Sequence, residues 1–292
     1  MNHQRFFGKR TSYICILLII LKSSFMEAQN ILIEGDSVNY VLENILKEDQ
    51  ILREKFNSAL ENYGKNSSEF ELAAKNLING DLINQDKLDC IFDKYGWLTP
   101  PSISKEASMA YFYVIQHAQI EFQKRYKNHV IKAFELGIID TLDYQLFIDR
   151  IAIRDQKYQK YGTQIMTDNI NNNYFIPIDT TEYLEDNLAN RIKQKFIEND
   201  FILFANKDFL TLFIHAFNPK SNTPVAFLEI YLDNKKLGQT NSKGFFQAQI
   251  KRGKNESLLT IIDTNSKQKQ SINLKYDESI DFYDKYFGFS CN

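Results

Sequence analysis

The chain has 292 residues, enough for two domains or one large one, and its 43% hydrophobic content, with 23 Phe and 16 Tyr, is ample for packed cores. A formal net charge of -2 produces no field that would gather nucleic acid or anionic lipid, so we expect neither as a partner. The sequence holds no CxxC pair and no His/Cys pair at metal-ligand spacing. This argues against a structural zinc site, and we expect no metal and no cofactor.

Residues 1–28 have the pattern of a secretion signal: a basic start, the apolar run Tyr13–Leu21, and small residues up to Ala28. The run is about half the length of the roughly 20 residues that a membrane span requires. We therefore expect cleavage after Ala28, a periplasmic or secreted protein, and no stable membrane span afterwards. An uncleaved anchor is the alternative. Export places Cys90 and Cys291 in an oxidising compartment, where they are candidates for a disulfide.

Helical periodicity dominates residues 29–204, which we predict to be an all-α helical bundle domain. The expected helices, in chain order, span residues 38–63, 68–78, 81–95, 104–122, 123–136, 141–160 and 181–201. Residues 165–180 lack periodicity and are expected to form a long loop.

The helix expected at 104–122 is the predicted core of this bundle. Between Ala107 and Ala118 only Ser108, Gln116 and His117 are polar. A helix that is apolar on nearly every side is surrounded by protein. Gln116 and His117 therefore need hydrogen-bond partners if they are buried.

The period changes near residue 208, where alternation typical of β-strands begins. Short strands are expected at 209–217, 225–232, 245–250, 258–262 and 271–274, separated by turn residues. This spacing predicts a small β-sandwich over residues 205–275, followed by an aromatic tail at 276–292.

Four short motifs occur in order along the helical part: Gly96-Trp97, Gln116-His117-Ala118, Asp149-Arg150 and Tyr161-Gly162-Thr163-Gln164. With them, residues 49–191 resemble a family of uncharacterised bacterial proteins whose helical domain has no assigned function. Weaker points of the resemblance are Asp49-Gln50 with Arg53, and Pro177. Leu98 stands where the family usually has proline. The resemblance implies a shared helical domain and no particular activity.

The stretch from Gly238 to Phe246 resembles the turn-and-strand signature of carboxypeptidase-regulatory-like domains. In that family a strand ends at Thr, a Gly closes the turn, and an aromatic residue points into the sandwich. Asn241 stands where Asp is commoner, and both residues favour such turns. The resemblance implies a transthyretin-like accessory domain over residues 209–275, without catalysis of its own.

His117 and Asp149 are the candidate catalytic residues. A histidine titrates in the range that suits acid–base work, and Gln116 or a carboxylate such as Asp149 is a candidate to fix its tautomer. Arg150 is a candidate to bind a carboxylate or phosphate through its planar guanidinium. Alternatively, His117 is a core histidine bonded to a backbone carbonyl, and Asp149 and Arg150 form structural ion pairs.

Tyr161, Thr163 and Gln164 offer hydroxyl and amide groups that suit a polar ligand, and Gly162 can take a positive φ at the turn. Alternatively, this stretch only caps the preceding helix. We expect one concavity against the core helix, lined by His117, Asp149, Arg150, Tyr161 and Gln164.

No nucleophile elbow, phosphate-binding glycine loop or HExxH motif accompanies these residues. We therefore expect an exported envelope protein of unknown function whose helical domain binds a small ligand or an envelope protein, with an accessory β-sandwich. The alternative is a hydrolase-type enzyme that uses His117 as general base with Asp149 and Arg150.

Overall fold

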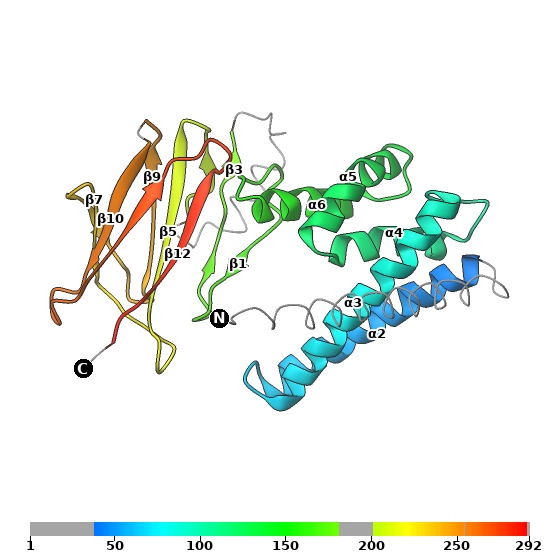
Figure 1. Ribbon diagram of the computed structural model, residues 1–292, viewed down its shortest axis with the longest axis horizontal. Helices are drawn as coiled ribbons and strands as arrows, with labels where there is room; N and C mark the ends of the chain where they lie inside the picture. The colour runs from blue at the N-terminus through cyan, green and yellow to red at the C-terminus, as the bar shows by residue number, and fades with distance from the viewer. Residues whose placement is uncertain (1–37, 181–200, 254, 291–292) are drawn as a thin grey trace, which may run out of the picture. The chain divides into compact units, whose positions relative to one another are not determined.

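The computed structural model describes residues 38–180, 201–253 and 255–290 (Figure 1). These residues form two compact units, divided between Asp140 and Thr141, and each is described by itself. The leader at 1–28, residues 181–200 of a predicted helix, and Cys291 lie outside the described residues. Within the described ranges, no helix is long and apolar enough to cross a membrane.

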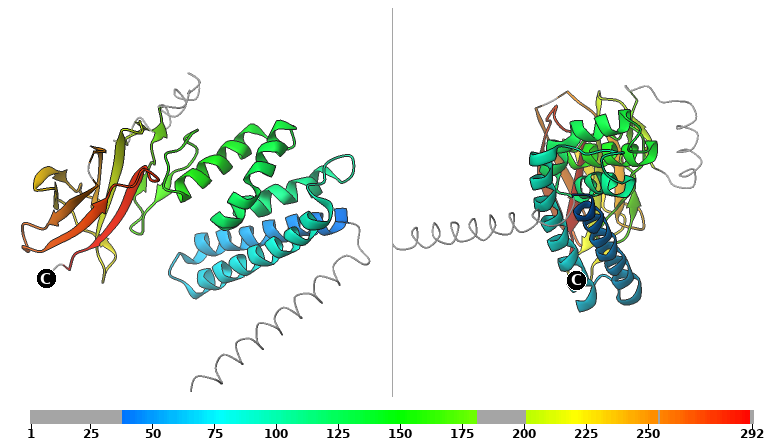
Figure 2. Two further views of the ribbon diagram at one scale, coloured as in Figure 1. Left: turned by 45° about the horizontal axis from the view of Figure 1, so that its top comes forward. Right: turned by 90° about the vertical axis from the view of Figure 1, so that its right-hand side faces the viewer.

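The first unit is helical. Helices α2 (Val38–Tyr63) and α3 (Ser68–Tyr95) lie side by side as a hairpin, in which the Ser67 hydroxyl accepts a hydrogen bond from the amide of Phe70 and so caps α3 (Figures 1 and 2). The break that we predicted near residue 79 is wrong, because α3 runs through Gly80 without interruption. A Cβ at Gly80 would lie 2.2 Å from Cδ1 of Leu52. This glycine therefore allows close approach of α2 rather than ending a helix.

Helix α4 (Lys105–His117) is the buried core helix that the sequence predicted. Ala107, Ala110, Tyr111, Phe112 and Ile115 are all 0% exposed. The Ser104 hydroxyl caps the helix by accepting from the amide of Ala107 at 3.0 Å. These buried side chains make α4 the centre of the first unit.

Helix α4 ends earlier than the predicted Phe122. Ala118 and Gln119 adopt extended backbone, and α5 (Ile120–Glu135) begins directly after them. His117 is therefore the last residue of α4, and its ring lies at the end of the helix where the negative pole of the helix dipole favours a cation.

The second unit begins with α6 (Thr141–Arg154) and continues into β-structure. The strands are β1 (Met166–Thr167), β2 (Asn173–Tyr174), β3 (Ile178–Asp179), β4 (Phe204–Ala205), β5 (Phe209–Asn218), β6 (Thr223–Pro224), β7 (Glu229–Leu232), β8 (Lys235–Gln239), β9 (Phe245–Lys251), β10 (Glu256–Ile262), β11 (Lys269–Lys275) and β12 (Phe282–Gly288). The predicted order, a helical region followed by a β-sheet region, is confirmed. The predicted domain boundary at 204/205 stays a prediction.

Two four-stranded sheets make up most of this unit (Figure 1). One has the order β11-β10-β7-β8. In the other, β5 pairs in parallel with β12 and antiparallel with β9 and β6. Alternate residues Leu210, Leu212 and Ile214 of β5 share one core with Leu259 and Ile261 of β10. The two sheets are not closed on themselves, which is consistent with the predicted sandwich.

Three parts of the β-region differ from the prediction. Strand β8 was not predicted, because its sequence KKLGQ lacks the alternation of a strand. Strand β7 begins only at Glu229, since Phe227 has φ 60° and interrupts the expected run. Residues of the expected aromatic tail form β12, whose Phe282 and Phe287 are buried.

A glycine closes the turn before β9, and the first aromatic residue after it, Phe245, packs on the face of the sheet away from the core between the two sheets. Gly244 has φ 69°, and a Cβ there would lie 2.3 Å from the backbone oxygen of Ala216. The Asn241 side chain accepts from the amides of Lys243 and Phe245, and the Phe245 side chain is buried. Only glycine fits the turn at this position.

The opposite face of β5 is covered by the chain that follows α6. Phe213 packs there with Tyr158, Tyr174 and Ile176. The segment 165–180, expected as a loop, thus carries the short strands β1 to β3 and belongs to the hydrophobic core of the second unit.

Candidate functional site

His117 belongs to a polar cluster at the meeting of α2, α3 and α4. Asp49 and Arg53 stand one helical turn apart on α2, and Asp81 projects from α3. Nη2 of Arg53 lies 3.1 Å from Oδ1 of Asp49 and 2.6 Å from Oδ1 of Asp81. Nδ1 of His117 lies 2.8 Å from Nε of Arg53 and 3.1 Å from Oδ1 of Asp49. We call these four side chains the His117 cluster.

The side chains of the His117 cluster differ in exposure, from one that is fully buried to three that are partly exposed. The Asp49 side chain is 2% exposed, whereas those of His117, Asp81 and Arg53 are 15%, 20% and 24% exposed. Burial works to raise the pKa of Asp49, but hydrogen bonds and charges from His117 and Arg53 outweigh it and hold the pKa below its ordinary value. Burial raises the pKa of Asp81 despite the opposing charge of Arg53. Asp49 is thus the anionic anchor of the cluster.

The hydrogen bond from Arg53 to Nδ1 favours one tautomer of His117, although Arg53 Nε also lies 3.2 and 3.3 Å from the two carboxylate oxygens of Asp49. The Arg53 guanidinium is always charged, so its Nε–H always donates. At 2.8 Å it needs the lone pair of His117 Nδ1. With this bond in place, neutral His117 carries its proton on Nε2, whereas a hydrogen bond from Nδ1–H to Asp49 at 3.1 Å requires the other tautomer.

The outer nitrogen, Nε2, has no hydrogen-bond partner among the described residues, and the side chain is partly exposed. The ring of Tyr113 flanks the histidine, with ring centroids 6.0 Å apart. With the proton on Nε2, His117 presents one N–H donor at the surface, and Asp49 and Arg53 orient the ring through Nδ1.

Sequence reasoning identified His117 but missed its partner carboxylate. Asp49, Gln50 and Arg53 entered only as weak points of a family resemblance. The signal that was present is the spacing: Asp49 shares a helix face with the buried Leu42 and Ile45. A carboxylate on such a face needs a partner.

Asp149 is fully buried on α6 and accepts four hydrogen bonds from the chain that follows the helix. Oδ1 accepts from the amides of Lys160 and Tyr161 at 2.8 and 3.0 Å. Oδ2 accepts from the amide and the hydroxyl of Thr163 at 2.8 and 2.9 Å. Burial raises the pKa of Asp149, although these donors oppose it. Gly162 has the predicted positive φ, 69°, and lies in the turn that surrounds the carboxylate.

The other predicted ligand-binding residues take separate places. Gln164 donates from its amide to Gln159 at 2.8 Å, and Arg150 lies half-buried on α6. Gln116 is buried on α4, and its backbone carbonyl accepts from Gln123 at 2.6 Å.

His117 and Asp149 belong to different units, and each has its own polar surroundings. Their expected convergence stays a prediction. The carboxylate that the structure gives His117 is Asp49.

A second histidine lies in an unexpected polar network of the second unit. His215 on β5 is 0% exposed, with Nδ1 2.7 Å from Oδ2 of Asp168 and Nε2 2.8 Å from Oδ1 of Asp284. The second contact has ion-pair distance without hydrogen-bond geometry. The Tyr174 hydroxyl donates to Asp284 at 2.7 Å, and burial and Asp284 raise the pKa of that hydroxyl. His215 thus links β5 to a buried carboxylate of the loop after β1 and lies beside a carboxylate of β12.

Across the described ranges, no group of three or more His, Cys, Asp or Glu side chains is placed to hold a metal ion. Cys90 is half-buried on α3, and its predicted partner lies outside the described residues.

A family model described as a family of unknown function, DUF6624, matches residues 36–190, which are 155 of the 292 residues. No curated protein and no solved structure matches the chain. The matched range contains the His117 cluster, Asp149 and the stretch from Tyr161 to Gln164, and it ends before the two four-stranded sheets begin.

Proposed function

The chain belongs to DUF6624, a family of unknown function, and we propose from the geometry that its helical part is a ligand-binding module anchored by the His117 cluster. The observation that carries the proposal is the hydrogen bond from Arg53 to Nδ1 of His117. It leaves an N–H donor at Nε2 whether the ring is neutral or charged. A group that always donates suits recognition of an acceptor oxygen better than proton abstraction.

The charges of the cluster narrow the class of ligand. Asp49 and Asp81 bring two carboxylates and Arg53 one cation, so the cluster carries about one net negative charge while His117 is neutral. A negative site repels anions. The module therefore recognises a neutral or cationic small molecule, or a partner segment, that presents a carbonyl or hydroxyl oxygen to His117.

A hydrolase-type enzyme is the alternative, with His117 as general base and Asp149 and Arg150 in the same site. One observation favours it: Asp49 lies behind Nδ1 as an orienting carboxylate does in acid–base catalysis. A general base needs an unprotonated Nε2, and hence a proton on Nδ1. That proton would oppose the N–H of Arg53 at 2.8 Å.

Nitrogen-15 NMR of the histidine side chains separates the two functions. We expect the neutral ring of His117 to be the Nε2–H tautomer, and the Arg53→Leu variant to lose this preference. If the neutral ring in the parent protein is the Nδ1–H tautomer, the donor site is rejected and the general-base function remains.

Ligand binding itself is tested by thermal shift against a panel of neutral amides, sugars, amines and carboxylates. We expect the uncharged and cationic members of the panel to include compounds that raise the melting temperature. This stabilisation should be lost in His117→Ala and kept in His129→Ala, a matched change at an exposed histidine on α5. Stabilisation by carboxylates alone would contradict the charge argument.

The proposal also places the protein outside the cytoplasm, with the β-sandwich as an accessory domain of the carboxypeptidase-regulatory-like kind. The secretion-signal pattern of residues 1–28 supports export. The turn closed by Gly244 supports the sandwich type. Cell fractionation and the N-terminal sequence of the mature protein test export, and a full-length protein confined to the cytoplasm would contradict it.

A further inference from the structure

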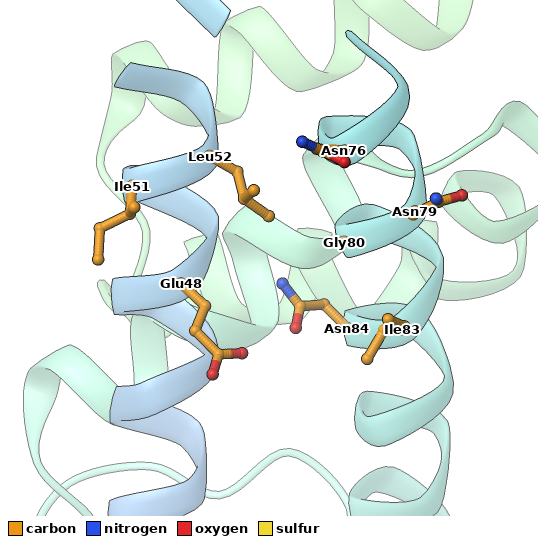
Figure 3. A pocket seen from close by; sticks show the side chains of 8 residues that line it. All are labelled: Glu48, Ile51, Leu52, Asn76, Asn79, Gly80, Ile83 and Asn84. Carbon is orange, nitrogen blue, oxygen red and sulfur yellow. The ribbon is translucent and has the colours of Figure 1, made fainter. Parts of the chain in front are cut away.

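A hollow of about 410 Å³ lies between α2 and α3 (Figure 3). This volume is within the roughly 300–1,000 Å³ typical of small-molecule pockets. Its lining combines aliphatic side chains with amides and one carboxylate: Glu48, Ile51, Leu52, Asn76, Asn79, Gly80, Ile83 and Asn84. None of these residues belongs to the His117 cluster.

Asn84 is the unusual member of this lining. Its side chain is directed from α3 into the space that faces α2, between Glu48 and Leu52 (Figure 3). The residue is only 3% exposed, and its side-chain nitrogen has no hydrogen-bond partner. A buried amide without a partner destabilises a fold. The nitrogen is thus an unpaired donor directed into the hollow.

The rim of the hollow combines exposed aliphatic side chains with the exposed polar residues Glu48, Asn76 and Asn79. Ile51 is 39% exposed and Ile83 is 54% exposed, although both are large hydrophobic residues. Glu48 is paired with Lys87 at 3.2 Å, so the one carboxylate of the lining is neutralised. Exposed aliphatic side chains around one buried donor suit a molecule with an apolar body and an acceptor oxygen.

We propose that this hollow is a binding site for a small uncharged molecule that has an apolar body and a carbonyl or ether oxygen. The oxygen accepts a hydrogen bond from Asn84, and the body packs on Ile51, Leu52 and Ile83. The site is separate from the proposed function of the His117 cluster and does not depend on it.

Two probes of similar shape test the proposal: cyclohexanone, which has an acceptor oxygen, and methylenecyclohexane, which has none. Each is titrated into the full chain up to its solubility limit, and NMR follows the Asn84 side-chain amide and the methyl groups of Ile51 and Ile83. We expect saturable shifts of all three with the ketone. One net hydrogen bond of about 1 kcal/mol makes the hydrocarbon about fivefold weaker.

Variants separate binding at Asn84 from nonspecific contact. Asn84→Leu should melt at a higher temperature, because it removes the unpaired amide, and should lose the preference for the ketone. If that variant does not fold, Asn84→Ala carries the same comparison. The matched control Asn62→Leu, at an exposed position of α2, and His117→Ala should both keep the preference.

Three results would overturn the proposal: no saturable shift at these side chains, equal affinity of the parent protein for both probes, or a ketone preference that persists in the folded Asn84 variants. Loss of the preference in His117→Ala would instead make the hollow a part of the first site.

Discussion

Asp149→Asn tests whether the carboxylate on α6 holds the following chain in place. Asn keeps the size and shape of Asp but replaces one acceptor oxygen with a donor. All four hydrogen bonds to Asp149 come from donors, three of them backbone amides. No orientation of an asparagine side chain can therefore satisfy every donor.

The least costly orientation places the new NH₂ at the position of Oδ2. The hydroxyl of Thr163 can turn and accept a hydrogen bond from it, but the amide of Thr163 then loses its acceptor. A buried unpaired amide costs roughly 1–3 kcal/mol. The two remaining bonds, from Lys160 and Tyr161, change from charge-assisted to neutral and weaken by a few tenths of a kcal/mol or more each. We expect a total loss of about 2–4 kcal/mol.

Urea unfolding at neutral pH measures this loss. The single tryptophan, Trp97, lies in the first unit, so its fluorescence reports on the unfolding of that unit. Far-ultraviolet circular dichroism at the wavelength of the β-sheet band follows the unfolding of the second unit. The circular dichroism transition should move to lower urea. Asp208→Asn, a matched change at an exposed carboxylate of the same unit, should leave it in place. A change in the free energy of unfolding below about 0.5 kcal/mol for Asp149→Asn, as for a surface substitution, would refute the reasoning.

Three further changes test other parts of the chain. Asp49→Asn should weaken the first unit at neutral pH and progressively less below about pH 4: its pKa is lowered by folding, so its stabilisation is present above the unfolded value and lost as the pH falls through the folded one. Urea titrations across this range, read by Trp97 fluorescence, check it, and a penalty independent of pH would contradict it. His215→Gln should cost about 1–3 kcal/mol in the second unit, since it removes the hydrogen-bond partner that His215 Nδ1 provides to the buried Asp168; a circular dichroism transition within about 0.5 kcal/mol of the parent would count against this role. Gly244→Ala should cost more than about 1 kcal/mol, while Gly253→Ala, where nothing lies within 4 Å, should cost little; equal effects on unfolding would reject the turn argument.

Periodicity located the core helix and the change from helix to strand, because both depend on residues close in the sequence. Periodicity failed where the role of a residue depends on a contact with a residue that is distant in the sequence. Gly80 reads as a helix end but serves contact with Leu52. Residues 282–288 read as a tail because a single run of aromatic residues does not show that β5 has an open edge beside it.

The candidate site shows the same division. A mostly apolar helix predicted that His117 would need a partner, and the structure supplies one. The partner, Asp49, stands 68 residues earlier, and no local pattern connects the two. His215 was overlooked since it lies in a strand whose residues are buried on both faces, where one histidine does not alter the period. Polar networks built across elements are therefore the part of the site that sequence reasoning reaches last.

The parallel pairing of β5 with β12 has a consequence for how the protein is made. Phe282 pairs with Thr211 and Gly288 with Phe217, so β5 leaves the ribosome well before its neighbour exists. At about 5–20 residues per second, one edge of β5 waits roughly 4–14 seconds with its backbone donors and acceptors unpaired. The first unit, built from helices that follow one another in sequence, has no such delay. A chaperone that holds the nascent chain, or passage across a membrane before folding, would protect β5 during this interval.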